Sequence, residues 1–182
     1  MLSFEIEHHP ETASTNTLLL GYARSGRPEG LVVTADYQTE GRGKPGRIWE
    51  SPAGKNLLFS VLLRPPIGIH QAPILTQIAC RSIAAALAET CGLACEFKRP
   101  NDVMVRGRKI CGILTEAQSS PAGLEAVVVG AGVNVNSGPD EIPPTATSVL
   151  IETGKKIDRR QLLDAILQQL KQETQGLYAP LS

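Results

Sequence analysis

Hydrophobic residues recur along the chain with two different periods, and these periods divide it into strands and helices. Alternating or continuous β-branched runs, which are typical of strands, occupy seven segments. The predicted strands cover residues 4–7, 31–37, 56–63, 96–98, 103–105, 109–117 and 124–135. Apolar residues at helical spacing predict helices over residues 15–24, 72–90 and about 158–176.

Polar residues and glycine mark the ends of these predicted helices. Either Ser14 or Thr15 can cap the first helix, and Asp158 is a natural N-cap for the last. Gly92 follows the middle helix in the position of a C-cap. The three helices therefore have chemically defined boundaries.

The order of the elements indicates the fold class. Strands that follow one another in sequence, with helices inserted in blocks, favour an α+β fold over a doubly wound parallel sheet. Turn-forming residues separate the four strands between residues 96 and 135, so a meandering antiparallel arrangement is expected there. We predict one α+β domain over residues 1–182, with a mixed, largely antiparallel sheet and helices packed mainly on one face.

Composition and charge exclude several classes of function. The 18 basic and 18 acidic residues give a net charge of zero, which argues against a broad nucleic-acid footprint. No apolar run reaches the ~18 residues of a membrane span. We therefore expect neither a nucleic-acid partner nor a membrane partner.

The cysteines and histidines do not form a metal-binding pattern. The four cysteines lack a C-x-x-C pair, and the three histidines are too few and too badly spaced for a zinc site. Such cysteines are typical of small buried hydrophobes in a reducing compartment, so a cytoplasmic location is expected. The residues concerned are Cys80, Cys91, Cys95, Cys111, His8, His9 and His70.

One loop concentrates positive charge in this otherwise neutral chain. Residues 40–50, named here the cationic loop, join two predicted strands and interleave three cations with three glycines: Arg42, Lys44, Arg47, Gly41, Gly43 and Gly46. Glycine lets backbone N–H groups approach a ligand closely, and Arg and Lys supply charge-assisted donors. The loop therefore suits a phosphate or carboxylate, although a solvated charged turn is the simplest alternative.

The glycine spacing in the cationic loop matches G-x-G-x-x-G, but its context does not match the known phosphate loops. A dinucleotide-binding loop opens a helix and is followed by an acidic residue about 20 positions on. Here a strand follows, with no carboxylate in residues 61–66, and the other kinase motifs are absent. Trp49, the only tryptophan, either packs in the core or offers a stacking platform for a nucleobase beside the loop.

Two further segments place glycines next to polar residues. Lys109 begins an apolar strand that Gly112 interrupts, shortly after Lys98-Arg99-Pro100-Asn101-Asp102. Glycines also occur in the strand that leads into residues 133–136, Val-Asn-Val-Asn. A strand glycine can bring a ligand against the backbone or can simply permit tight packing, and a lysine at a strand start is often a solvated charge.

Taken in order, four motifs resemble the catalytic domain of biotin protein ligases. They are S-T-N, then G-R-G-x-x-G-R-x-W-x-S-P-x-G-x-N-L, then K-x-P-N-D-V with K-x-x-G-I-L-x-E, then G-x-G-x-N-V-N. The resemblance implies a fold like that of class II aminoacyl-tRNA synthetases and biotin synthetases. It also implies that biotin and Mg-ATP form biotinyl-5′-adenylate (biotinyl-5′-AMP), and that biotin then passes to one lysine of a biotin carboxyl carrier domain.

The resemblance also assigns roles to residues. It implies that biotin contacts Ser14, Thr15, Asn16, Gln38, Gly41, Arg42, Gly43, Lys44, Lys109 and Gly112. The residues implied to contact ATP are Arg47, Trp49, Asn101, Asp102, Gly132 and Asn134, with Asp102 near Mg²⁺. Lys109, Arg42 and Lys44 are implied to be catalytic, because joining a carboxylate to an α-phosphate requires fixed cations.

This sequence departs from the family pattern at several points. Lys44 stands where the family commonly has Arg, which keeps the charge but loses the bidentate fork, and Arg99 stands where Trp is usual. We expect neither an N-terminal helix-turn-helix domain nor a C-terminal SH3-like barrel. Two alternatives therefore remain: a weakly active or inactive module that binds biotin or its adenylate, and a lipoate or octanoate ligase or transferase. The resemblance also allows a homodimer.

Overall fold

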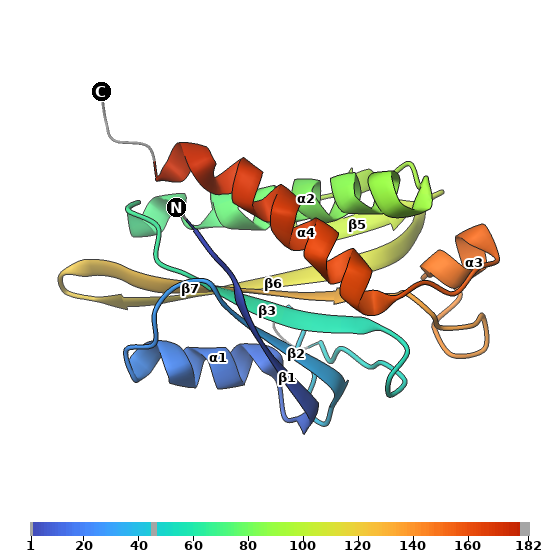
Figure 1. Cartoon of the computed structure of the whole chain (residues 1–182), viewed down its shortest axis with the longest axis horizontal. Coiled ribbons are helices and arrows are strands. Elements are labelled where there is room, and N and C mark those ends of the chain that lie inside the picture. The colour runs from blue at the N-terminus through green and yellow to red at the C-terminus, as the bar shows by residue number, and fades with distance from the viewer. Residues whose placement is uncertain (1, 45–46, 179–182) are drawn as a thin grey trace.

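The computed structural model describes residues 2–44 and 47–178 and contains one seven-stranded sheet with helices on both sides (Figure 1). The strands are β1 (Glu5–Thr12), β2 (Leu31–Gln38), β3 (Leu57–Leu63), β4 (Glu96–Lys98), β5 (Asp102–Val105), β6 (Arg108–Ser120) and β7 (Gly123–Val133). The α-helices are α1 (Thr15–Arg24), α2 (Pro73–Cys91), α3 (Val149–Thr153) and α4 (Arg159–Thr174). Short 3₁₀ turns, Ile69–Gln71 and Gln175–Leu177, precede α2 and follow α4.

The sheet is mixed and largely antiparallel, as predicted. The strand order is β1-β2-β3-β7-β6-β5-β4, in which β1 and β2 are parallel and every other neighbouring pair is antiparallel. All seven predicted strands and three predicted helices are present, but α3 was not predicted. Its five residues are too few to display a helical period, although the hydroxyl of Ser148 caps it by accepting from the N–H of Ile151 at 3.1 Å.

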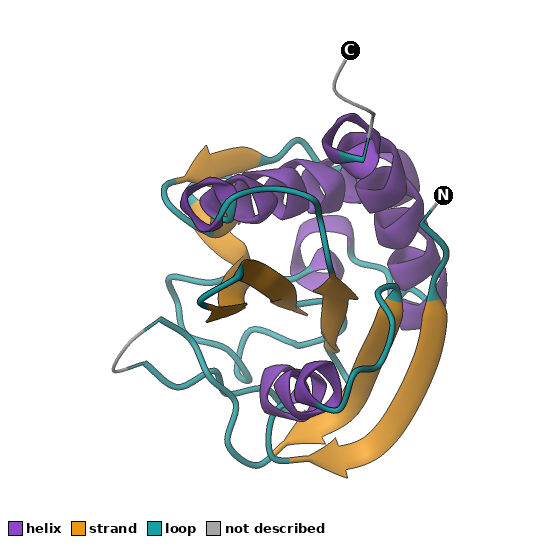
Figure 2. Cartoon of the chain, turned by 90° about the vertical axis from the view of Figure 1, so that its left-hand side faces the viewer, coloured by secondary structure: helices purple, strands orange, loops and turns teal. Residues whose placement is uncertain are grey.

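Both faces of the sheet are covered, because its central strands are apolar on both sides. Residues Leu57, Phe59, Val61 and Leu63 of β3 belong to the core under α2 and α4, whereas Leu62 belongs to a smaller core under α1. Figure 2 shows α1 alone on its side of the sheet, opposite the two long helices. The helices thus lie mainly on one face, and α1 is the exception that borders the site described below.

The caps predicted from the sequence lie at the boundaries of α1, α2 and α4. Gly92 adopts the left-handed conformation (φ 67°) and closes α2, and the carboxylate of Asp158 accepts from the N–H of Arg160 at 2.8 Å at the start of α4. Ser14, one of the two candidate caps, is the N-cap of α1. These local signals are strong enough to be read from sequence.

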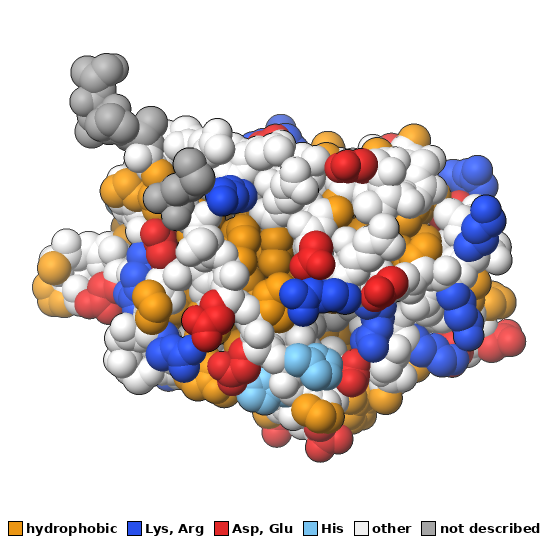
Figure 3. Space-filling view, in the orientation of Figure 1, with side chains coloured by type: hydrophobic (Ala, Val, Ile, Leu, Met, Phe, Trp, Pro, Cys, Tyr) orange, Lys and Arg blue, Asp and Glu red, His pale blue; other side chains and the backbone are white. Residues whose placement is uncertain are grey.

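The surface carries interspersed charges of both signs, as the face in Figure 3 illustrates. This distribution agrees with the zero net charge of the chain. Within residues 2–44 and 47–178, none of the helices has the length and apolarity that crossing a bilayer would require.

Candidate functional site

A strip of glycines on the α1 side of the sheet forms the floor of a cavity. Gly112 of β6 pairs directly with Gly132 of β7. Gly130 lies two residues before Gly132, on the same face of β7. A Cβ atom on Gly132 would lie 2.4 Å from Cε2 of Trp49, and one on Gly112 would lie 2.8 Å from its Cζ3. A Cβ atom on Gly130 would lie 2.0 Å from Oδ1 of Asn16. These glycines therefore make room for the Trp49 indole and the Asn16 amide.

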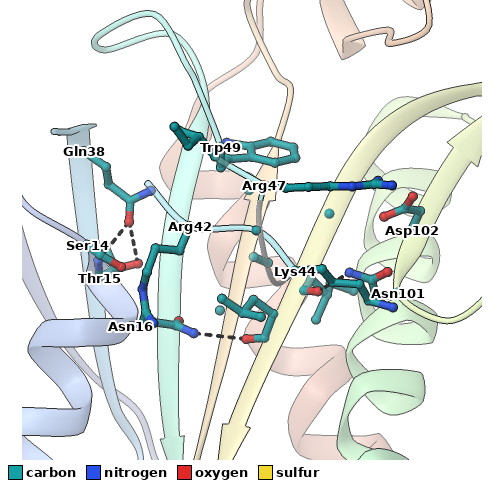
Figure 4. Close-up of a pocket in the computed structure, with 18 of the residues that line it drawn as sticks. Ser14, Thr15, Asn16, Gln38, Arg42, Lys44, Arg47, Trp49, Asn101 and Asp102 are labelled. Carbon is teal, nitrogen blue, oxygen red and sulfur yellow. Dashed lines mark hydrogen bonds between the residues drawn. The ribbon is translucent and has the colours of Figure 1, made fainter. Parts of the chain in front are cut away.

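The cavity above this floor collects most of the residues that the sequence nominated. The space between its walls is about 670 Å³, a figure that includes part of the open solvent at its mouth. Its lining includes Ser14, Thr15, Asn16, Gln38, Arg42, Gly43, Lys44, Arg47, Trp49, Asn101, Asp102, Lys109, Gly112 and Gly132. Figure 4 shows Ser14, Thr15, Asn16 and Gln38 on one side and Lys44, Arg47, Asn101 and Asp102 on the other.

A second cavity adjoins the first and accounts for two nominated residues missing from that lining. Gly41 and Asn134 line the second cavity, whereas Trp49, Lys109 and Gln38 line both. Trp49 and Lys109 therefore stand where the two cavities meet. The remaining nominated loop residue, Gly46, lies outside the described residues.

A hydrogen-bond network fixes the polar side of the first cavity. The N–H and hydroxyl of Thr15 donate to Oε1 of Gln38 at 2.8 and 3.1 Å. The buried hydroxyl of Ser60 lies 2.6 Å from Oδ1 of Asn16 and 2.7 Å from the Thr15 hydroxyl. Because the β2 end, β3 and the first turn of α1 all contribute, the network holds these groups in one geometry.

Arg42 has a partner that sequence reasoning did not identify. Its Nη1 and Nη2 groups donate to Oε1 and Oε2 of Glu116 at 3.0 and 2.7 Å. The same Oε2 accepts from Nδ2 of Asn16 at 2.8 Å. The guanidinium of Arg42 thus already holds a carboxylate in this structure.

Lys109 also has an acidic partner, and it lies against the tryptophan. Its ammonium is 2.8 Å from Oδ1 of Asp102 and 5.4 Å from the centroid of the Trp49 ring. Among the ion pairs between described residues, none involves Lys44 or Arg47. Lys44 and Arg47 thus bring two cations, without a paired carboxylate in the described part of the chain, to a wall that also carries Asp102.

The two asparagines nominated for ATP contact are held by contacts within the protein. Nδ2 of Asn101 donates to the carbonyl of Ile113 at 2.6 Å, and the N–H of Ile113 donates back to the Asn101 carbonyl at 3.0 Å. Oδ1 of Asn134 accepts from Nδ2 of the buried Asn56 at 3.4 Å. Both asparagines thus support the fold at the cavity wall.

The structure adds four residues to the site that the sequence did not nominate: Glu116, Ser60, Asn56 and Gly130. Glu116 closes the K-x-x-G-I-L-x-E motif and lies four residues after Gly112, on the same face of β6. This even spacing from Gly112 could have indicated from the sequence that Glu116 faces the cavity side of the sheet. Arg99, one of the departures from the family pattern, lines a neighbouring groove that also includes Cys80 and shares Asn101 and Asp102 with the first cavity.

Cys80 and Cys111 are buried, whereas Cys91 and Cys95 are partly buried against the core. Burial raises the pKa of Cys80 and of Cys95 to about 11, and raises that of Cys111 well above its ordinary value. Their thiols are therefore protonated near neutral pH, as expected for core residues. Within the described part of the chain, histidine, cysteine and acidic residues form no cluster of three or more suited to a metal ion.

Comparison with known proteins gives one family. The model described as "Biotin/lipoate A/B protein ligase family" matches residues 9–134. The bifunctional ligase/repressor BirA of Bacillus subtilis is 37% identical over 164 residues, which cover 88% of this chain and 50% of that protein. The biotin–[acetyl-CoA-carboxylase] ligase of Paracoccus denitrificans is 40% identical over 162 residues, covering 85% and 67%.

Solved structures agree with this comparison. The biotin protein ligase from Aquifex aeolicus in complex with biotin and ATP matches with a TM-score of 0.81 and 30% identity, covering 96% of this chain and 72% of that one. This chain spans about half the length of the Bacillus relatives that it matches.

Proposed function

This chain belongs to the biotin/lipoate A/B protein ligase family, and from that premise we propose that it is an ATP-dependent biotin protein ligase. It activates biotin to biotinyl-5′-AMP and transfers the biotinyl group to a lysine of a biotin carboxyl carrier domain. One observation carries the proposal: a single cavity brings together a fixed polar network and four cations, Arg42, Lys44, Arg47 and Lys109.

The first step joins two anions, and the cavity is built to reduce their repulsion. A carboxylate oxygen of biotin attacks the α-phosphorus of ATP, the new P–O bond forms, and the bond to pyrophosphate breaks. Lys44 and Arg47, which lie opposite the polar network, stabilise negative charge on the phosphates (Figure 4). Lys109, at the junction of the two cavities, bridges the carboxylate and the α-phosphate.

The two cavities divide the substrates between them. Biotin occupies the first cavity, where the amide and hydroxyl groups of Thr15, Asn16 and Gln38 recognise its polar ring. The adenosine part of ATP extends into the second cavity, beside Trp49 and Asn134. Arg47, Asn101, Asp102 and Gly132, which are also proposed to contact ATP, line the first cavity, so the phosphates would lie there beside Lys109.

The second step consumes the mixed anhydride. The neutral amine of the acceptor lysine attacks the acyl carbon, the amide bond forms, AMP leaves, and the amine proton is released. Because the acyl-adenylate is labile to water, the cationic loop is expected to cover it until the acceptor arrives. The acceptor is a carrier domain, in a cytoplasmic setting that suits the four free cysteines.

Magnesium enters this proposal as part of the substrate Mg-ATP. Asp102 is the one acidic residue among the described residues that line the first cavity, and it is paired with Lys109. Mg²⁺ commonly binds through phosphate oxygens and water with one or two carboxylates, so this sparse donor set fits it. Asp102 would supply the protein oxygen, and the ion would neutralise phosphate charge.

Biotin-dependent exchange of labelled pyrophosphate into ATP tests the first step, and mass increase of a carrier domain tests the second. Both should require biotin and Mg-ATP, and lipoate or octanoate should not replace biotin. Exchange supported by lipoate instead of biotin would indicate a lipoate ligase of the same family. Tight biotin binding without exchange, even at high ATP, would leave only a binding module.

A further inference from the structure

We propose that Glu116 is a positioning residue that docks the cationic loop onto the sheet and orients Asn16 for ligand binding. Glu116 lines neither the first nor the second cavity, so it would not touch the reacting atoms. It would act through Arg42 and Asn16, which do line the first cavity.

The cationic loop is a small hairpin with two attachments. Arg42 and Ile48 form an antiparallel bridge, the N–H of Gly43 donates to the Arg47 carbonyl at 3.0 Å, and the N–H of Trp49 donates to the Gly41 carbonyl at 2.9 Å. One side of the hairpin rests on the floor through the Trp49 indole. The other side is held by the two hydrogen bonds from Arg42 to Glu116.

The Arg42 attachment has no substitute on the described part of the loop. Among residues 40–44 and 47–50, Arg42 alone makes side-chain hydrogen bonds to the sheet. Its two bonds form a bidentate pair between a guanidinium and a carboxylate, which is directional as well as charge-assisted. Loss of the carboxylate should therefore free that side of the hairpin.

Glu116 also determines which way the Asn16 amide faces. Nδ2 of Asn16 donates to Oε2 of Glu116 at 2.8 Å and to the carbonyl of Leu114 at 3.1 Å. These two acceptors leave Oδ1 facing the hydroxyl of Ser60 at 2.6 Å. One carboxylate thus joins the loop, the first turn of α1 and β6.

A carboxylate this close to an anion site would ordinarily repel the ligand. Here both of its oxygens accept hydrogen bonds from Arg42, which compensates the charge. Arg42 would therefore place the loop in addition to lining the cavity beside Lys44, Arg47 and Lys109. The kinetic part of this inference rests on the proposed function, but the docking part does not.

Trp49 provides a direct readout of docking, because it is the only tryptophan and sits on the loop. In ligand-free protein, Glu116→Gln should shift Trp49 emission to the red and increase its quenching by acrylamide. In the biotin-dependent reaction it should raise KM for biotin about 10-fold, equivalent to about 1.4 kcal/mol, with kcat changed less than about 3-fold. Glu116→Asp, which keeps the charge, should restore part of both signals.

Glu173→Gln is the matched control. It breaks a similarly exposed pair with Arg81, whose Nε lies 2.8 Å from the carboxylate, between α2 and α4 and away from the cavity. It should leave Trp49 emission and KM unchanged. A Glu116→Gln shift in Trp49 emission that persists undiminished in an Arg42→Ala background would show that docking does not run through Arg42, and would overturn the docking role.

The remaining outcomes separate this inference from the proposed function. An active ligase in which Glu116→Gln alters neither Trp49 emission nor KM for biotin would refute the positioning role. Glu116→Gln should shift Trp49 emission to the red in the wild-type background but cause no additional shift in the Arg42→Ala background. That result would support docking through Arg42, even if the wild-type protein shows no pyrophosphate exchange with biotin.

Discussion

Lys109 and Asp102 form an ion pair with 2.8 Å between Nζ and Oδ1, directly beside the ring of Trp49. The pair holds the ammonium at the junction of the two cavities without any substrate. A flexible lysine fixed in this way loses less conformational entropy when a phosphate arrives. The relationship makes Lys109 the residue whose removal should affect catalysis most.

Lys109→Ala should therefore reduce the rate of biotin-dependent pyrophosphate exchange at least ~100-fold, a loss of about 2.7 kcal/mol of transition-state stabilisation. The reason is the loss of a fixed cation between a carboxylate and an α-phosphate. Initial rates at saturating biotin and ATP would measure the effect. Lys155→Ala, at an exposed position, is the control. Unchanged turnover in Lys109→Ala would remove Lys109 from the proposed mechanism.

The glycine floor predicts a different kind of defect. Gly132→Ala should displace the indole, because the added Cβ would lie 2.4 Å from Cε2 of Trp49. Overpacking of this kind typically costs about 1–3 kcal/mol of stability. Trp49 emission and biotin binding by calorimetry should both change. If Gly132→Ala keeps wild-type emission and affinity, the Trp49 indole does not pack against Gly132 as closely as the structure indicates.

Gly21→Ala is the matched substitution with the opposite expected sign. Gly21 lies inside α1, and a Cβ there would meet nothing within 4 Å. Alanine in a helix interior is favoured over glycine by roughly 0.5–1 kcal/mol, so the free energy of unfolding should rise. Urea denaturation would measure it, and activity should be unaffected. A decrease in stability would contradict the environment assigned to this helix.

Much of the fold could be predicted because its signals are local. Strand alternation, helical spacing and the caps at Gly92 and Asp158 all lie within a few residues of the feature that they specify. The five-residue helix α3 has no such pattern, and nothing local shows which face of the sheet α1 covers. That choice depends on Leu62 of β3 and on Ala126 and Val128 of β7, which meet α1 only in the folded chain.

The sequence nominated residues that line two adjoining cavities, but it did not indicate how they pair. The order of the motifs indicated that Arg42 and Lys109 belong to one site, and both line the first cavity. Glu116, the partner of Arg42, is 74 residues away in sequence, and no local pattern predicts their contact. The pairing of Gly112 with Gly132 depends on the β6–β7 register, which shifts at an irregularity between Gln118 and Ser119. The spacing of residues along one strand does not determine its register with the next strand. The contact of the Trp49 indole with Gly112 and Gly132 was therefore visible only in the structure.

The buried thiols predict a loss of stability in alkali. The pKa of Cys80 is raised by burial to about 11 from an ordinary value of 9.0, and that of Cys95 is raised similarly. Between about pH 9 and 11 the unfolded chain releases these protons while the folded chain keeps them. The stability that they contribute is thus complete below pH 9 and is lost as pH rises through the folded pKa.

Urea unfolding near pH 8 and near pH 11 should therefore give a lower free energy at the higher pH. Part of that difference should disappear in Cys80→Ala, where one raised group is absent. Tyr178, whose pKa is also raised by burial and by its hydrogen bond to Glu29, contributes in the same direction and remains in both proteins. The comparison with Cys80→Ala consequently isolates the thiol. Equal alkaline losses in the two proteins would show that Cys80 does not titrate as its burial requires.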